Sequence, residues 1–390
     1  MREAPQTRTI ANQPSFVLET ANVEAAITRK CGMLAPVVFF RDSAPVTPYA
    51  IAPWHDEEVP AGAPAVVKAL RGDFMCSAFG GNEEPFKGRR LPVHGETASE
   101  EWDVVEQVKT DRGVALRLAM DLVLQGGRCV KHTALVKGHN VVYQRDDFSA
   151  VDGPINPGHH ATLRFPDRPG AGRLSFSPFA YSHTFIEPCE NPAQGGYSWL
   201  KPDQPVGDLA AVPCIDGSVA DVTRYPARRG FEDIVILCAD PSLRIAWSTV
   251  TFPDEGWLWF SLRDPGRLPS TLLWISNGGR HYPPWNGRHV NVMGIEDMTG
   301  FFHVGLAASA RDNMLSGKGF KTCHRLSKEE TLEIPYVQGV ARIPGDFDRV
   351  AAIEVEDAES VRFVSDSGVS ALTPCHADFC RTGKLGDLIR

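Results

Sequence analysis

Three places in this sequence carry residue types that can move protons. His94 precedes a glycine and lies eight residues before Trp102. His159 and His160 stand in tandem before an apolar run, and Glu296 follows another apolar run. An imidazole with a pKa of about 6.5, and a carboxyl group whose pKa rises on burial, are common partners in general acid–base catalysis. These places therefore predict a site for proton transfer.

The tandem histidines stand at the entrance of a predicted strand over residues 161–165. Successive residues of a strand face opposite sides. Only one of the two imidazoles can then point into a given cavity, and the other anchors the strand. The residues alone do not say which of His159 and His160 is the functional one.

The segment 276–302 combines side chains that could hold a sugar. Aromatic rings offer flat apolar faces for a sugar ring, and polar side chains offer donors for its hydroxyl groups. The aromatic candidates are Tyr282 and Trp285, and the donors are Arg280, Asn286 and Arg288. Glu296 lies at the end of the apolar run 290–295, where a rigid strand would hold its carboxylate in place.

Period-two alternation indicates that strands form most of the fold. In 116–124 the even positions are Leu or Met, while Arg117 and Asp121 fall on the other face, as in a half-buried antiparallel strand. Residues 129–144 indicate two strands broken at 138–140. Similar windows occur at 16–26, 33–40, 172–177, 234–238, 244–252, 256–262, 271–275, 289–295 and 349–364. Brief helical turns are predicted only at 327–331 and 357–360.

So many strands without helices must bury their apolar faces against one another, which predicts an all-β fold with a large antiparallel β-sandwich. The 35 glycines and 30 prolines are scattered between the windows and form no linker. We therefore expect a single domain over 1–390, with residues 1–14 as an extended N-terminal segment. The sequence leaves open whether 311–390 completes the sandwich or forms an appendage.

Charge and cysteine content narrow the classes of partner. A net charge of −8 disfavours nucleic acid and anionic membranes, since such partners need clustered Lys and Arg. No apolar run has the length of a secretory signal or a membrane span, so we expect a cytoplasmic protein. Nine widely spaced cysteines suggest reduced thiols. Cys375, His376 and Cys380 lack a fourth ligand for a zinc site.

Taken in order, the three places resemble the motifs of the aldose 1-epimerase (galactose mutarotase-like) family. His94-Gly95 with Trp102 resembles the first motif of the family, and 160–163 resembles its second histidine strand. The run 294–299, Gly-Ile-Glu-Asp-Met-Thr, resembles the third. The resemblance covers about residues 16–310.

The resemblance implies the supersandwich fold of that family and an enzyme that interconverts sugar anomers. It assigns Glu296 as the base and His160 as the acid, with His94 positioning or polarising the ring oxygen. It implies no metal and no organic cofactor, and a small-molecule sugar as partner of a monomer or homodimer. The substrate-binding residues we expect are His159, Asn82, Trp285, Arg288 and Tyr282.

The sequence also departs from the family pattern. The arginine that usually precedes the His-Gly motif has no clear counterpart, because Asn82 and acidic residues stand in that region. Residues 96–98 replace the aromatic-Ala-Arg run that usually follows the motif. Substrate binding must therefore differ from that of the family, and the sugar itself is not specified.

Two other functions remain open at this point. A non-catalytic carbohydrate-binding protein of the same fold would keep Tyr282 and Trp285 but tolerate loss of Glu296. A metal-dependent enzyme would use His159, His160 and Glu296 as ligands. The second is disfavoured because neighbouring strand residues would have to bind one ion from opposite faces.

Overall fold

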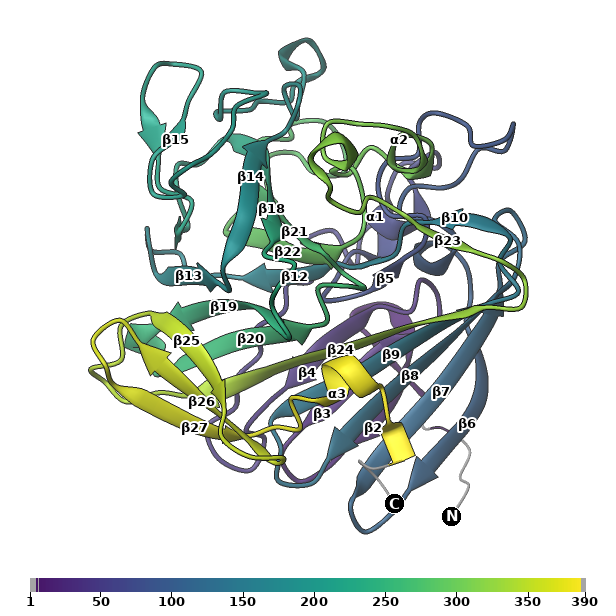
Figure 1. The fold of residues 1–390 in the computed structure, drawn as a ribbon, viewed down its shortest axis with the longest axis vertical. Coiled ribbons are helices and arrows are strands. Elements are labelled where there is room, and N and C mark those ends of the chain that lie inside the picture. The colour runs from purple at the N-terminus through teal and green to yellow at the C-terminus, as the bar shows by residue number, and fades with distance from the viewer. Residues whose placement is uncertain (1–4, 6, 387–390) are drawn as a thin grey trace.

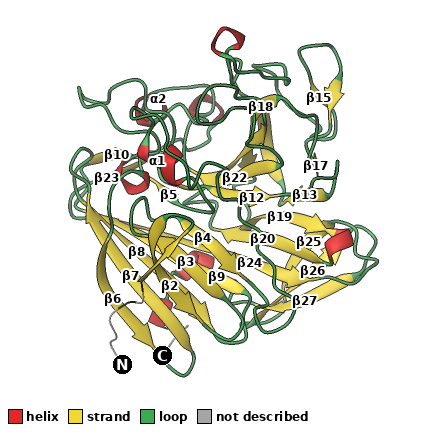
Figure 2. Ribbon diagram, turned by 180° about the vertical axis from the view of Figure 1, so that it is seen from behind, coloured by secondary structure: helices red, strands yellow, loops and turns green. Residues whose placement is uncertain are grey.

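The computed structural model describes residues 5 and 7–386, and Figure 1 shows that its regular secondary structure is mainly strands. Two large sheets, one of nine strands and one of seven, carry the fold. Figure 2 shows the helices as short turns outside the sheets. The predicted all-β fold with a large antiparallel sandwich is confirmed.

The nine-stranded sheet has the order β17-β13-β19-β20-β24-β9-β8-β7-β6. Its strands in chain order are β6 Asp103–Lys109, β7 Gly113–Asp121, β8 Arg128–Val136, β9 Val141–Ser149, β13 Gly172–Phe176, β17 Arg224–Tyr225, β19 Ala246–Phe252, β20 Trp257–Arg263 and β24 Thr331–Arg342. All neighbouring strands are antiparallel. The break predicted at 138–140 is confirmed between β8 and β9.

The seven-stranded sheet has the order β14-β18-β21-β22-β11-β5, and β12 also pairs with β22. Its strands are β5 Met75–Cys76, β11 Gly158–His159, β12 Ala161–Arg164, β14 Phe179–Thr184, β18 Phe231–Ala239, β21 Ser270–Asn277 and β22 Val292–Met298. It therefore brings together the tandem histidines and the strand that carries Glu296.

Smaller elements complete the described part of the chain. The four-stranded sheet holds β1 Thr7–Ile10, β2 Gln13–Glu19, β3 Glu24–Thr28 and β4 Leu34–Val38. Strand pairs are β10 Gly153–Ile155 with β23 His324–Leu326, and β15 Val212–Pro213 with β16 Val219–Ala220. The α-helices are α1 Ala65–Ala69, α2 Leu306–Ala310 and α3 Phe379–Thr382, and the 3-10 turns are η1 Glu96–Ala98, η2 Pro192–Gln194, η3 Pro253–Glu255 and η4 Ser316–Lys318.

Strand β7 shows how the alternation of apolar and polar side chains determines which face of a strand packs into the core. Leu116, Leu118 and Met120 are buried, whereas Asp121 is exposed. Burying one such side chain is worth about 1.5–3 kcal/mol, so each strand is held with its apolar face inward. The largest hydrophobic cluster joins side chains from the four-stranded sheet and both large sheets.

The C-terminal region belongs to the same body of sheets. Strand β24 lies inside the nine-stranded sheet, between β20 and β9. A three-stranded sheet follows, made of β25 Val350–Val355, β26 Ser360–Ser365 and β27 Ser370–Pro374. Its Phe363 packs on Phe260 of β20, with ring centroids 5.0 Å apart. Residues beyond 311 thus complete one large sheet and cover part of it.

Several local predictions need revision. Residues 327–330 form a turn before β24, and 357–359 form a bend, so neither is helical. Within the predicted extended segment 1–14, β1 and the start of β2 form a hairpin. Residues 1–4 and 6 lie outside the described residues, and the single-domain assignment stays a prediction.

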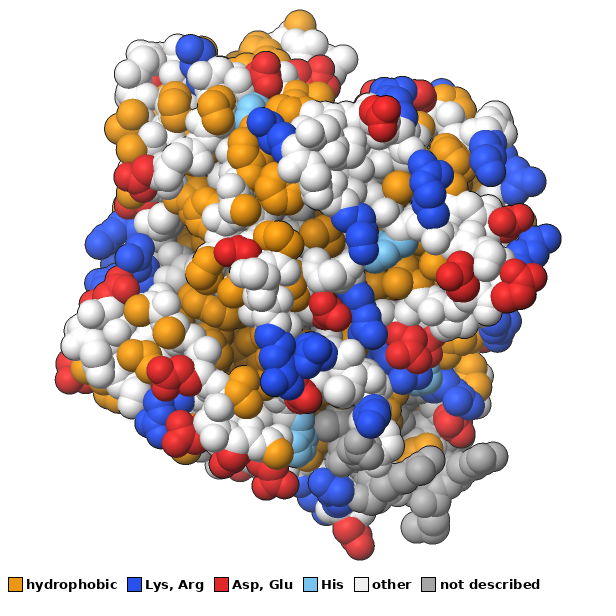
Figure 3. All heavy atoms as spheres, viewed as in Figure 1, with side chains coloured by type: hydrophobic (Ala, Val, Ile, Leu, Met, Phe, Trp, Pro, Cys, Tyr) orange, Lys and Arg blue, Asp and Glu red, His pale blue; other side chains and the backbone are white. Residues whose placement is uncertain are grey.

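Two surface observations bear on the predicted partners. On the face shown in Figure 3, Lys and Arg side chains are interspersed with Asp and Glu side chains. Positive charge is therefore not gathered there into a large patch. Among the described residues, no helix is long and apolar enough to span a membrane.

Candidate active site

His160 and Glu296 lie opposite each other on neighbouring chain segments of the seven-stranded sheet. Strand β12 pairs with β22 so that Ala161 lies opposite Ile295, and continuing this register places His160 opposite Glu296. Directly opposed residues share one face of a sheet. Nε2 of His160 accordingly lies 3.1 Å from Oε1 of Glu296, and both side chains are buried.

The hydrogen bonds of His160 indicate where the proton of this pair resides. The hydroxyl of Thr162 donates to the carbonyl of His160, at 3.4 Å. With the hydroxyl hydrogen placed there, the hydroxyl oxygen of Thr162 can accept from Nδ1–H of His160, at 3.1 Å. A neutral imidazole has one donor and one acceptor nitrogen, so Nε2 is left to accept a proton from the carboxyl group of Glu296.

Burial favours the same neutral pair. It raises the pKa of Glu296 well above its ordinary value, although the positive charge of Arg280 opposes the shift. Burial also lowers the pKa of His160 to about 4. A charged group loses hydration in such a place, so both residues favour the uncharged form. Both shifts favour a protonated carboxyl group that donates to a neutral imidazole.

Aromatic neighbours fix the ring of His160. Its backbone N–H donates to the carbonyl of Phe74 at 3.0 Å, and the two rings stack with centroids 4.6 Å apart. The ring of His94 meets His160 edge-on at 4.9 Å. His160 is thus held between a stacked ring and a second imidazole.

The loop that carries His94 is folded tightly. Gly95 has φ of +79°, and a Cβ there would lie 1.7 Å from the carbonyl oxygen of Ser77, so only glycine fits. Nδ1 of His94 accepts from the N–H of Gly80 at 3.4 Å. The other ring nitrogen, Nε2, then carries the proton. Burial and neighbouring His160 lower the pKa of His94 well below its ordinary value, so the ring is neutral.

Arg280 supplies the cation of the site. Its guanidinium lies over Trp285 at 4.5 Å and over Trp274 at 5.4 Å. Its Nε donates to Oε1 of Glu190 at 2.6 Å. Among the described residues no hydrogen bond engages its terminal NH groups. The side chain is therefore fixed by two rings and a carboxylate, while two donor groups remain available.

These side chains surround a single cavity of about 150 Å³. Its polar lining consists of His94, His160, Arg280, Glu296 and His303. Aromatic lining comes from Phe74, Trp274 and Trp285. The cavity therefore offers a proton donor–acceptor pair, a neutral imidazole and a cation beside flat apolar rings, which suits a small polyhydroxylated ring.

Gly294 provides the room that Glu296 occupies, and this gives a testable expectation. A Cβ at Gly294 would lie 2.5 Å from Oε1 of Glu296. Since that oxygen ends a flexible side chain, Gly294→Ala should displace the carboxyl group while preserving the fold. We expect the activity of the site to fall about 10- to 100-fold, as misplaced catalytic groups do, with a small change in melting temperature. Activity and thermal melts measure the two effects.

Gly345→Ala is the matched control, because nothing lies within 4 Å of a Cβ at that position. It should leave activity unchanged. A Gly294→Ala variant of full activity would show that the carboxyl position observed here is not required.

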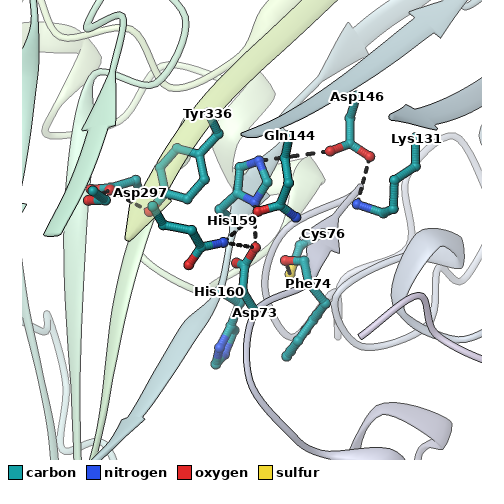
Figure 4. Close-up of polar contacts among 12 residues, drawn as sticks. Asp73, Phe74, Cys76, Lys131, Gln144, Asp146, His159, His160, Asp297 and Tyr336 are labelled. Atoms are coloured by element: carbon teal, nitrogen blue, oxygen red, sulfur yellow. Dashed lines mark hydrogen bonds and ion pairs between the residues drawn. The ribbon is translucent and has the colours of Figure 1, made fainter. Parts of the chain in front are cut away.

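His159 lies on the other side of the sheet, as Figure 4 shows. Its Nδ1 is 3.0 Å from Asp73, and its ring stacks on Tyr336 of β24 at 4.0 Å. It is fully buried between the two large sheets and does not line the cavity. The expectation that His159 contacts substrate is revised by this position, because strand alternation turns it away from His160.

Of the other predicted binding residues, only Trp285 lines the cavity. Asn82 is buried and donates to backbone carbonyls, including that of Ala78 at 2.9 Å. Arg288 forms an exposed ion pair with Glu57 at 2.6 Å. The hydroxyl of Tyr282 donates to Glu190 at 3.1 Å. These three side chains already have protein partners and support the loops around the site.

The expected set of binding residues omitted Arg280 and His303. Arg280 stood in the sugar-pocket segment as a possible donor, but its sequence neighbours did not distinguish it from Arg288. His303 has no motif around it, and burial lowers its pKa to about 4. Arg280 places a cation in the lining of the cavity.

The metal-enzyme alternative fails on geometry. His159 and His160 point to opposite faces of the sheet, and His159 is held by Asp73. Among the residues that the structure describes, no three His, Cys, Asp or Glu side chains are placed to hold a metal ion. The two-histidine, one-carboxylate arrangement is not assembled.

The chain forms two large antiparallel sheets, and the cavity lies on the smaller one. Solved structures of the galactose mutarotase-like β-sandwich share this fold. The resemblance found in the motifs is thus confirmed for the fold.

The fold of this chain is similar to that of several solved structures. A proposed aldose 1-epimerase from Escherichia coli K12 superposes with a TM-score of 0.54 and 13% identity, covering 84% of this chain and 99% of that one. A galactose mutarotase related enzyme from Lactobacillus acidophilus gives 0.53 and 11%, covering 84% and 97%. No family model and no curated protein sequence matches the chain. The likeness therefore rests on the fold.

Proposed function

We propose that this protein interconverts the anomers of an aldose by acid–base-assisted ring opening. The observation that carries the proposal is the hydrogen-bonded pair of His160 and Glu296, which faces one cavity together with His94. Ring opening needs a base at the anomeric hydroxyl and an acid at the ring oxygen. This pair can supply both.

The pair becomes acid and base by one internal proton transfer. When the proton of Glu296 moves to Nε2 of His160, the carboxyl becomes a carboxylate and the ring an imidazolium. The carboxylate takes the proton of the anomeric hydroxyl, and the imidazolium gives its proton to the ring oxygen. The bond between C1 and the ring oxygen breaks, C1 turns, and the reverse steps close the ring on its other face. Ring opening thus moves one proton to the protein and one from it, and ring closure reverses both transfers, so the protein ends unchanged.

His94 and Arg280 would assist without exchanging protons. The Nε2–H of His94 would donate to the ring oxygen as charge develops there. The terminal NH groups of Arg280 would hold hydroxyl groups, and its charge favours the carboxylate form of Glu296. The reaction requires no metal and no organic cofactor. The cytoplasmic location and the monomeric or homodimeric state stay predictions.

Two-dimensional exchange NMR with a panel of aldoses tests the proposal. The protein should increase the exchange rate between the anomeric protons of at least one aldose beyond the spontaneous rate. Binding of sugars without any increase would support the carbohydrate-binding alternative.

The pH dependence follows from the shifted pKa of His160. Its neutral form accepts the proton of Glu296, and it is protonated only as pH falls through about 4. The catalysed rate should therefore persist down to about pH 4 and fall below it, whereas an ordinary histidine would titrate at about 6.5. A rate profile from pH 3.5 to 8, corrected for spontaneous exchange, measures this. Half-loss of rate near pH 6.5 would contradict the neutral-pair mechanism.

A further inference from the structure

Six aliphatic side chains also line the cavity. Helix α1 contributes Val66 and Val67, its C-cap residue is Leu70, and the others are Val93, Ile234 and Leu272. We call these six residues the aliphatic side of the cavity. They line the same cavity as the polar residues described above.

The sheet register brings the aliphatic side next to the proposed acid–base pair. Leu272 lies directly opposite Glu296 across β21 and β22, and Ile234 lies opposite Trp274 across β18 and β21. Helix α1 lines the same cavity, and Nε1 of Trp54 donates to the carbonyl of Val67 at 2.8 Å. A sugar whose anomeric centre reaches Glu296 would therefore lie beside Leu272.

The charges of the cavity argue against an anionic sugar. Arg280 is the only Lys or Arg in the described lining, and Glu190 already binds it at 2.6 Å. Glu232 also lies close enough to influence the pKa of Arg280. A phosphate group brings a charge of about −1.5 to −2 at neutral pH. No uncompensated cation in the described lining would balance it.

We propose that the substrate is a neutral, unphosphorylated 6-deoxyhexose whose C5 methyl group packs against the aliphatic side. This inference rests on the proposed anomer exchange. A methyl group gains from burial against Val67, Ile234 and Leu272. The hydroxymethyl group of an ordinary hexose would lose its water there and find no side-chain partner.

Matched sugar pairs test the substrate class. The pairs are D-fucose with D-galactose, 6-deoxy-D-glucose with D-glucose, L-rhamnose with L-mannose, and L-fucose with L-galactose. In the pair with the best stereochemistry, kcat/KM for the 6-deoxy sugar should exceed that for the parent hexose by about 10- to 100-fold, the range in which an apolar pocket rejects an added hydroxyl. D-Glucose 6-phosphate and D-galactose 6-phosphate test whether the protein accepts an anionic sugar.

Val67→Thr reports on the aliphatic side itself. Threonine has nearly the shape of valine and adds a hydroxyl group that could bind the 6-hydroxyl of a hexose. The ratio of the two kcat/KM values should shrink at least threefold. Val105→Thr is the control, since Val105 is 43% exposed on β6 and should leave the ratio unchanged.

The outcomes separate the two proposals. Equal acceleration of both members of every pair, or faster exchange of a 6-phosphate, would overturn the substrate class and leave anomer exchange standing. A ratio that Val67→Thr does not alter would also contradict the placement of the methyl group. No acceleration of any sugar would overturn both proposals.

Discussion

Glu296→Gln should lower the rate of anomer exchange by about 10²–10⁴-fold, the usual contribution of a positioned acid–base group. Glutamine keeps the size of glutamate, and its amide can donate to Nε2 of His160 as the carboxyl does. It cannot transfer a proton to His160 or take one from the sugar. The loss should therefore appear in kcat, while sugar binding stays close to that of the wild type.

Exchange NMR gives the rate for this variant, and saturation-transfer NMR gives its binding. Glu329→Gln is the matched control, because Glu329 is exposed and should not affect either measurement. If Glu296→Gln exchanged anomers as fast as the wild type, Glu296 would have no part in proton transfer. If binding were lost as well, the residue would act in holding the sugar.

The residues of the proposed acid–base pair could be selected from the sequence because strands position them. A tandem of histidines on a strand must split between two faces, and a glutamate at the end of an apolar run has a fixed direction. The structure resolves the choice that sequence left open: His160 faces the cavity and His159 faces the space between the sheets. Register between β12 and β22, which local sequence does not encode, decides that His160 meets Glu296.

The remaining lining was harder to predict because loops and a short helix supply much of it. Helix α1 has five residues and no capping hydrogen bond from a side chain, so it leaves little periodic signal. Arg280 and Arg288 stand in one loop, yet one enters the cavity and the other pairs with Glu57 at the surface. The two arginines differ because each lies near a different acidic side chain. Contacts between segments that are distant in the sequence determine which acidic side chain that is.

The space between the sheets holds a buried ionic network that sequence did not predict. Nζ of Lys131 lies 2.8 Å from Asp146, and both side chains are buried. The same aspartate lies 3.8 Å from Nε2 of His159, and Asp73 holds the other side of that ring at 3.0 Å. Figure 4 shows this network on the side of the sheet away from His160. It joins β8 and β9 of the larger sheet to β11 of the smaller one.

Lys131→Met should destabilise the protein by about 3–5 kcal/mol, since it removes one partner of a buried ion pair and leaves the other charge unpaired. Burial lowers the pKa of Lys131, but the Asp146 carboxylate more than offsets this and raises it overall, so the lysine is charged. Methionine fills nearly the same volume, which limits any cavity. The free energy of unfolding in urea, followed by tryptophan fluorescence, measures the effect.

The double variant Lys131→Met, Asp146→Asn tests the cause of that loss. Asparagine removes the unpaired charge, so the double variant should be more stable than Lys131→Met alone, and a double-mutant cycle gives the coupling. Lys328→Met, at an exposed position, should change stability by less than about 0.5 kcal/mol. A loss below about 1 kcal/mol for Lys131→Met would show that the pair contributes no more than a surface ion pair does. In that case Asp73, which contacts both His159 and Gln338 of β24, would be the stronger polar link between the two sheets.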